Sequence, residues 1–143
     1  MGQWGDTRRS ESRLRVYVVE DSTKLATRLM ELLEGSGAEI AGHSDTAATA
    51  IREIAASNPE LVIVDIALRR GNGFDVLRAL QSDNDDHRPV AIVFSNHTRA
   101  SYRAAARECG AEYYFDKSSE VFTMLRLVSN MATSISLRNG SDP

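Results

Sequence analysis

The sequence has little of what marks secreted, membrane or nucleic-acid-binding proteins. Its one cysteine, Cys109, cannot form an internal disulfide, which favours a reducing compartment. No apolar run approaches the roughly 18 residues that span a bilayer, and no charged and then apolar leader opens the chain. The formal net charge of −3 gives no argument for binding nucleic acid or an anionic membrane. We therefore expect a cytoplasmic protein that contacts neither nucleic acid nor membrane.

A single alternating region lies between two polar ends. A chain of 143 residues is expected to form one domain. Residues 1–13 and 138–143 are polar and contain glycines or turn residues, so we expect flexible tails there. The domain is then predicted over residues 14–137.

Five short apolar runs in this region predict strands that are separated by helices. The predicted strands are Arg15–Val19, Ala38–His43, Leu61–Val64, Val90–Phe94 and Tyr113–Phe115. The predicted helices start after Ser22, after Asp45 or Thr46, near Phe74, at Thr98, and after Ser118 or Ser119. Strands that alternate with helices predict an α/β fold with a doubly wound, five-stranded parallel sheet.

Three carboxylates follow two of the most apolar strands. Glu20 and Asp21 come directly after Val19, and Asp65 comes directly after Val64. If these strands are neighbours, the three acids meet in one crevice, because ligands of open α/β sheets bind at the carboxyl ends of the strands. Their mutual repulsion is best relieved by a hard divalent cation, and an oxygen-only ligand set suits Mg²⁺.

Two further polar residues end strands at the same edge of the sheet. Ser95 follows the fourth strand and Lys117 follows the fifth. A central carboxylate can act as a nucleophile toward phosphorus, a hydroxyl can bond a phosphoryl oxygen, and a lysine can neutralise its charge. The set therefore favours phosphoryl chemistry.

The order of these residues resembles the receiver domain of two-component response regulators. The resemblance covers roughly Leu14 to Leu137, and the set that carries it is Glu20-Asp21, Asp65, Gly73, Ser95 and Lys117. It implies a flavodoxin-like (βα)5 fold with strand order 2-1-3-4-5.

The resemblance also implies how the acceptor and the metal ion are held. Asp65 would be the phosphoacceptor. Asp21 would bind Mg²⁺ directly, Glu20 would hold a metal-bound water, and the backbone carbonyl of Ala67 would be a further ligand.

The remaining roles implied by the resemblance concern signalling. Lys117 would pair with the phosphoryl group, Ser95 would be the switch hydroxyl and Tyr114 the switch aromatic residue. The output face would be formed by the helix from Thr98, the strand at Tyr113–Phe115 and the last helix.

The implied partners are a sensor histidine kinase or a histidine phosphotransfer protein, and a downstream protein target on the output face. The protein would catalyse only its own phosphorylation and dephosphorylation, so it is not expected to be an enzyme in the usual sense. No effector segment follows the predicted domain, so we expect a stand-alone regulator.

Three positions depart from the family's common pattern. Ser118 replaces the usual proline after the lysine, which disfavours a cis peptide and predicts a looser loop. Asn96 replaces the usual small residue after the switch hydroxyl. Arg69 replaces a usual proline, and with Arg70 it is either a solvated loop or a basic pair that steers an acidic partner.

The last helix has an unusually wide apolar arc. One stripe consists of Val121, Leu125, Val128, Ala132 and Ile135, and a second of Met124, Leu127 and Met131, with Phe122 beside it. The arc indicates either a wide core or a surface for a partner or a homodimer, and we favour the surface because methionines suit adaptable interfaces.

Two other classes of function remain open. A Mg²⁺-dependent phosphohydrolase of the haloacid-dehalogenase type would place an Asp-x-Asp motif on the first strand, where this chain has Glu20-Asp21-Ser22. A receiver-like interaction module that is never phosphorylated is the other alternative. Loss of an acidic residue, of Asp65 or of Lys117 would indicate such a module, but all of them are present.

Overall fold

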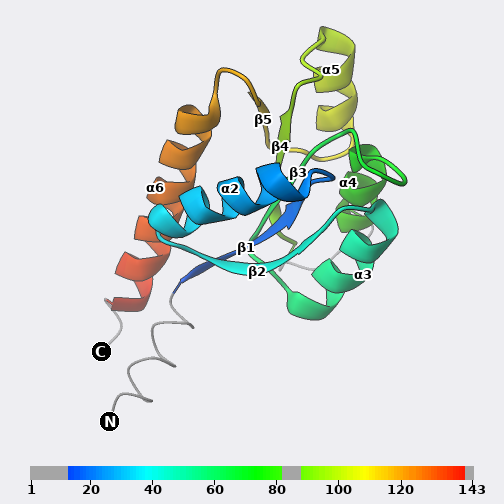
Figure 1. Cartoon of the computed structure of the whole chain (residues 1–143). Coiled ribbons are helices and arrows are strands. Elements are labelled where there is room, and N and C mark those ends of the chain that lie inside the picture. The colour runs from blue at the N-terminus through cyan, green and yellow to red at the C-terminus, as the bar shows by residue number, and fades with distance from the viewer. Residues whose placement is uncertain (1–12, 82–87, 141–143) are drawn as a thin grey trace.

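Five parallel strands form one sheet with helices on both faces in the computed structural model, which describes residues 13–81 and 88–140 (Figure 1). The strands are β1 (Leu14–Val19), β2 (Ala38–Ser44), β3 (Leu61–Val64), β4 (Val90–Ser95) and β5 (Tyr113–Asp116). The helices are α2 (Thr23–Gly35), α3 (Ala47–Ser57), α4 (Gly73–Gln81), α5 (Ala100–Glu108) and α6 (Val121–Gly140). The strand order β2-β1-β3-β4-β5 confirms the expected doubly wound, flavodoxin-like class.

The sheet is buried on both faces, as its near-continuous apolar strands require. Successive residues of β1 point to opposite sides, so that Val16 and Val18 pack under α2 and α6 while Tyr17 and Val19 pack under α3, α4 and α5. Figure 1 shows the same division, with α2 and α6 on one side of the sheet and the other helices opposite. The two cores hold the strands rigidly, and the carboxyl ends of the strands are thereby fixed relative to one another.

The first helix begins as expected, but one residue of its predicted apolar face is exposed. Helical spacing predicts that this face carries four leucines, Leu25, Leu29, Leu32 and Leu33. The Ser22 hydroxyl accepts a hydrogen bond from the Leu25 amide at 3.2 Å and so caps α2. Leu29 and Leu33 are buried, but the Leu25 side chain is 49% exposed. The buried stripe of α2 consists of Ala26, Leu29 and Leu33, so the first turn packs through Ala26 and Leu25 lies beside that stripe.

The last helix packs most of its apolar arc into the core of the protein. Met124 is fully buried, and Leu125, Val128, Ala132 and Ile135 belong to the same core. Leu127 and Met131 are half-buried against it, whereas Phe122 is 76% exposed. The wide apolar arc is therefore mainly core, and the prediction that Met124 belongs to a partner surface is wrong. A partner or homodimer contact at the half-buried Met131 and the exposed Phe122 stays a prediction.

The structure bears only partly on the predicted domain limits. The proposed tails fall largely on residues 1–12 and 141–143, which lie outside the described residues. Helix α6 continues past Leu137 to Gly140, so the folded part extends beyond the predicted end of the domain. Among the described residues, no helix combines the length and apolar character needed to cross a membrane.

Candidate functional site

Glu20, Asp21 and Asp65 meet at the carboxyl edge of the sheet because β1 and β3 are hydrogen-bonded neighbours. Val19 and Val64 are paired, and the Asp65 amide donates to the Val19 carbonyl at 3.0 Å. One carboxylate oxygen from each of the three acids lies within 4.8 Å of the others. Glu20 and Asp65 are buried and Asp21 is exposed, so one side of the cluster is open to solvent.

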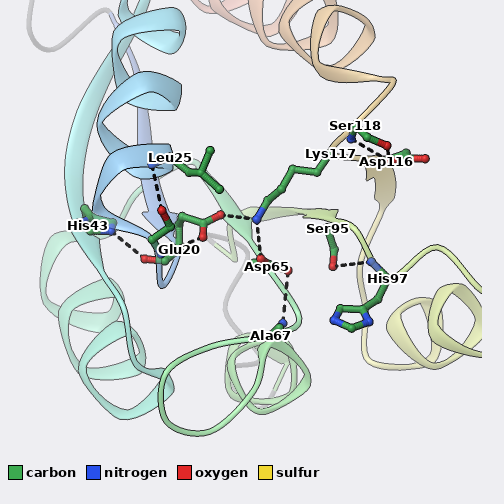
Figure 2. A network of polar contacts seen from close by, with 11 residues as sticks. Glu20, Leu25, His43, Asp65, Ala67, Ser95, His97, Asp116, Lys117 and Ser118 are labelled. Atoms are coloured by element: carbon green, nitrogen blue, oxygen red, sulfur yellow. Dashed lines mark hydrogen bonds and ion pairs between the residues drawn. The ribbon is translucent and has the colours of Figure 1, made fainter.

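Lys117 reaches from the end of β5 into this acidic cluster (Figure 2). Its Nζ lies 2.6 Å from Asp65 Oδ2 and 2.6 Å from Glu20 Oε1. The three side chains are 12%, 7% and 4% exposed, so these are buried ion pairs. Such pairs are short and strong when both groups are charged, and they fix the position of the ammonium group.

Burial and the neighbouring charges shift the pKa values of Glu20 and Lys117. Burial raises the pKa of Glu20, and the hydrogen bonds from Lys117 and from the Ser22 amide offset part of that effect. Burial alone would lower the pKa of Lys117, but the hydrogen bonds and charges of Asp65 and Glu20 outweigh it, so the pKa of Lys117 is raised. Lys117 is therefore a fixed positive charge at neutral pH.

The acidic cluster fits a hard divalent cation. Three carboxylates against one ammonium leave an excess of negative charge, and their oxygens lie close enough together to share one ion. Oxygen ligands of this kind suit Mg²⁺, which keeps several waters and takes few protein ligands. Glu20, Asp21 and Asp65 are the residues that would hold it, as expected from the sequence.

A tight loop carries the peptide that follows Asp65. The Ala67 amide lies 3.3 Å from Asp65 Oδ1, and the Gly73 amide donates to the Ile66 carbonyl at 2.9 Å. A Cβ atom at Gly73 would lie 2.5 Å from the Asp65 carbonyl oxygen, so only glycine fits there. Gly73 thus lets the start of α4 pack directly against the candidate acceptor.

The same loop is fastened to the loop after β2. Arg69 Nε and Asp45 Oδ2 form an ion pair at 2.9 Å, and the Arg69 amide donates to the Asp45 carbonyl at 3.2 Å. The Ala47 amide donates to the Arg70 carbonyl at 3.0 Å. Arg69 is therefore engaged with this chain's own Asp45 at an exposed surface, which favours the solvated loop over a steering role.

Ser95 and Tyr114 are joined through the backbone of His97. The Ser95 hydroxyl is fully buried and accepts a hydrogen bond from the His97 amide at 3.1 Å (Figure 2). The hydroxyl of the half-buried Tyr114 donates to the His97 carbonyl. Burial raises the pKa of Tyr114, while the Ser95 hydroxyl and the charge of Arg103 act in the opposite direction. Tyr114 is thus turned inward, behind the loop that carries Ser95.

Hydrogen bonds around Asp116 hold the loop after Lys117. The Asp116 carboxylate accepts from the Ser118 amide at 2.8 Å and from the Ser118 hydroxyl at 2.7 Å. The Asp116 amide donates to Glu120 Oε1 at 2.8 Å, and the Glu120 amide donates to the Asp116 carbonyl at 2.8 Å. The described residues contain no cis peptide bond. These four hydrogen bonds hold the loop that the sequence predicted to be looser than usual.

Two residues near the site were not predicted from the sequence. Asp116 was not recognised as a loop anchor, although an aspartate side chain commonly accepts a hydrogen bond from the backbone two residues further on. Arg103 was not singled out, because an arginine on an amphipathic helix usually faces solvent. Its guanidinium lies over the Tyr114 ring, 4.9 Å from the ring centroid.

Comparison with known proteins gives one family. The family model described as the response regulator receiver domain matches residues 16–129. The DNA-binding response regulator MtrA of Mycolicibacterium paratuberculosis is 40% identical over 74 residues, which cover 50% of this chain and 32% of that protein. The KDP operon transcriptional regulatory protein KdpE of Escherichia coli is 32% identical over 102 residues, which cover 71% of this chain and 44% of that protein. The matches therefore span less than half the length of these relatives.

Solved structures show the same fold. A DNA-binding response regulator of the LuxR family from Staphylococcus aureus superposes with a TM-score of 0.75 at 22% identity, over 83% of this chain and 98% of that one. The response regulator domain of Thermotoga maritima CheB gives a TM-score of 0.69 at 19% identity, over 92% and 99% of the two chains. At these identities the likeness concerns the fold alone.

Proposed function

Because this chain belongs to the response regulator receiver domain family, we propose that it accepts a phosphoryl group on Asp65 and signals through a change at Ser95 and Tyr114. The observation that carries the proposal is the position of Lys117 Nζ, 2.6 Å from Asp65 Oδ2 inside a cluster of three carboxylates. A nucleophile, a fixed cation and a metal-binding set thus share one edge of the sheet.

The chemistry follows from these positions. An Asp65 oxygen attacks the phosphorus of a phosphohistidine, so that an O–P bond forms, the P–N bond breaks and the histidine ring keeps the electron pair. Lys117 neutralises charge on the transferred group from a position that is already fixed, which lowers the cost of reorganisation. Mg²⁺ bound by Asp21 and Asp65, with Glu20 holding a metal-bound water and the Ala67 carbonyl as a further ligand, would supply further charge neutralisation.

The signal would pass through the second half of the same edge. The phosphorylated Asp65 offers new oxygens to the Ser95 hydroxyl, which now accepts from the His97 amide. A shift of Ser95 moves the loop whose His97 carbonyl accepts the hydrogen bond from the Tyr114 hydroxyl. Phosphorylation would thereby favour the inward orientation of Tyr114 over the outward one. The output is then read on the face formed by α5, β5 and α6.

The expected partners follow from the phosphodonor and from this face. A sensor histidine kinase or a histidine phosphotransfer protein would deliver the phosphoryl group, and a downstream protein or a second copy of the chain would bind the output face. In this proposal the protein is a cytoplasmic regulator that acts by binding a partner.

The proposal is tested by incubating the protein with a small phosphodonor and Mg²⁺ and measuring the intact mass. We expect a gain of one phosphoryl group in the wild type, no gain in Asp65→Asn, and no gain after chelation of the metal. Asp45→Asn is the matched control, because Asp45 is a surface aspartate paired with Arg69 away from the cluster. If neither the small donor nor a phosphorylated histidine domain adds mass, the proposal fails and the unphosphorylated interaction module takes its place.

A further inference from the structure

Arg103 on α5 makes three contacts around Tyr114. Its Nε donates to the Thr98 carbonyl at 3.1 Å, and its Nη1 donates to the Tyr114 carbonyl at 3.3 Å. The guanidinium also lies 4.9 Å from the centroid of the Tyr114 ring, at a distance where a cation is attracted to the ring face. One side chain thus binds the loop after β4 and both the backbone and the ring of Tyr114.

The same guanidinium reaches the loop that carries Lys117. Arg103 Nη2 lies 4.0 Å from Glu120 Oε1, and that oxygen accepts a hydrogen bond from the Asp116 amide at 2.8 Å. Asp116 directly precedes Lys117 in the chain. Arg103 therefore connects α5 to both segments that approach the phosphorylation site, one through Tyr114 and one through Glu120.

Tyr114 has space for a second orientation. A cavity of about 270 Å³ lies between α5 and β5, and its lining includes Tyr114, Arg103 and Arg107. The ring is only half-buried, so packing alone does not confine it. The inward orientation consequently depends on specific contacts, which are the hydroxyl bond to the His97 carbonyl and the cover provided by Arg103.

We propose that Arg103 is a positioning residue that holds Tyr114 inward and so sets the resting balance of the output face. This inference rests on the proposed function, because it concerns the regulation of the same switch. None of the Arg103 contacts involves Asp65, so the contribution of Arg103 is present whether or not Asp65 is phosphorylated. It therefore adds a constant bias toward the inward state, and phosphorylation acts on top of that bias.

The contacts of Arg103 predict the size of the effect. Its side chain is 37% exposed, so water competes for the guanidinium and the bias is moderate. We expect loss of the side chain to reduce the inward-to-outward ratio of Tyr114 about fivefold, the size of a partly exposed cation–ring contact. Arg103→Lys keeps a cation near the ring but loses the planar group that bonds two carbonyls, so it should restore only part of the ratio.

The test is a fluorine NMR spectrum of protein labelled with fluorotyrosine, in which Tyr114→Phe identifies the Tyr114 signal. Arg103→Ala should move this signal away from the wild-type position in protein that has received no phosphodonor, and Arg103→Lys should lie between the two. Arg107→Ala is the matched control, because Arg107 lies one turn further along α5 and lines the same cavity. The control should keep the wild-type signal.

The phosphorylated samples separate this inference from the proposed function. Arg103→Ala should gain the same phosphoryl mass as the wild type, and its Tyr114 signal should move further on phosphorylation because it starts from a less inward state. An unchanged Tyr114 signal in Arg103→Ala would overturn the role of Arg103, even if the protein is phosphorylated normally. A shifted signal in protein that no donor phosphorylates would support the role of Arg103 and contradict the proposed function.

Discussion

The two halves of the carboxyl edge are held together by different forces. The acidic half, formed by Glu20, Asp65 and Lys117, is held by buried charges, with both ion pairs at 2.6 Å. The switch half, formed by Ser95, His97 and Tyr114, is held by hydrogen bonds between neutral groups and by the partly exposed Arg103 over the Tyr114 ring. His97 is exposed and Tyr114 half-buried, whereas Glu20 and Asp65 are buried.

In the proposed function, this difference would let one edge of the sheet both accept a phosphoryl group and change conformation in response. Moving a residue of the acidic half leaves a buried charge without a partner, which is costly unless another charge replaces it. Moving the switch half gives up a neutral hydrogen bond, which costs about 1 kcal/mol. In the proposed function, a new charge on Asp65 would therefore act where charge dominates, and the conformational response would occur where the contacts are weak.

Removal of Lys117 should have the largest effect. Lys117→Met leaves two buried carboxylates without their cation, so we expect a loss of about 3 kcal/mol in the free energy of unfolding at neutral pH. Added Mg²⁺ should recover part of the loss, because it balances the same carboxylates. Denaturant unfolding with and without Mg²⁺ measures both effects.

Lys24→Met, an exposed change on α2, is the control for Lys117→Met and should be close to neutral. If Lys117→Met proves as stable as this control, the acidic half is not held by charge and the comparison fails.

A smaller, pH-dependent effect is expected at Glu20. Its pKa is raised by burial, so the folded state holds this proton more tightly than the unfolded chain does. The contribution of Glu20 to the free energy of unfolding of the wild type should therefore fall as the pH rises from 4.5 through its raised pKa. Glu20→Gln should become increasingly stable relative to the wild type over that window and differ little below it.

Unfolding midpoints measured across this pH range test the prediction for Glu20. Glu31→Gln, an exposed change on α2, should track the wild type at every pH. A Glu20→Gln protein whose advantage shrinks as the pH rises would show that the Lys117 bond, and not burial, dominates at Glu20.

The smallest effect is expected in the switch half. Tyr114→Phe removes the hydroxyl that donates to the His97 carbonyl but keeps the ring under Arg103, so we expect a loss of about 1 kcal/mol. Tyr113→Phe is the control, because Tyr113 is 42% exposed and its loss should stay below about 0.5 kcal/mol. If Tyr114→Phe lowers the free energy of unfolding as much as Lys117→Met does in the same assay, the two halves are not held by forces of different strength.

The acidic half was more predictable from the sequence than the switch half. Glu20, Asp21 and Asp65 follow apolar strands, and parallel strands bring such residues to one edge, so their meeting follows from the pattern. The switch roles predicted for Ser95 and Tyr114 rest on the resemblance to receiver domains, and no side-chain pattern indicates that the two residues are linked through the His97 backbone. A pattern of residue types does not indicate which backbone carbonyls accept hydrogen bonds from side chains.

The misses have a similar physical origin. Leu25 fits the apolar spacing of α2, but the first turn of that helix is buried through Ala26 instead. The covering of Tyr114 by Arg103 depends on how α5 lies against β5, and helix periodicity carries no such information. The predicted partner surface on α6 counted Met124 as surface because the sequence does not reveal how deep the core is.

The most direct test of the account is to locate the phosphoryl group. Phosphorylated protein is reduced with borohydride, which converts an aspartyl phosphate to homoserine, and its peptides are then mapped by mass spectrometry. We expect homoserine at position 65 alone, in place of Asp65. Modification at Asp21 or Asp45 instead, or a phosphoryl group that resists borohydride, would contradict it.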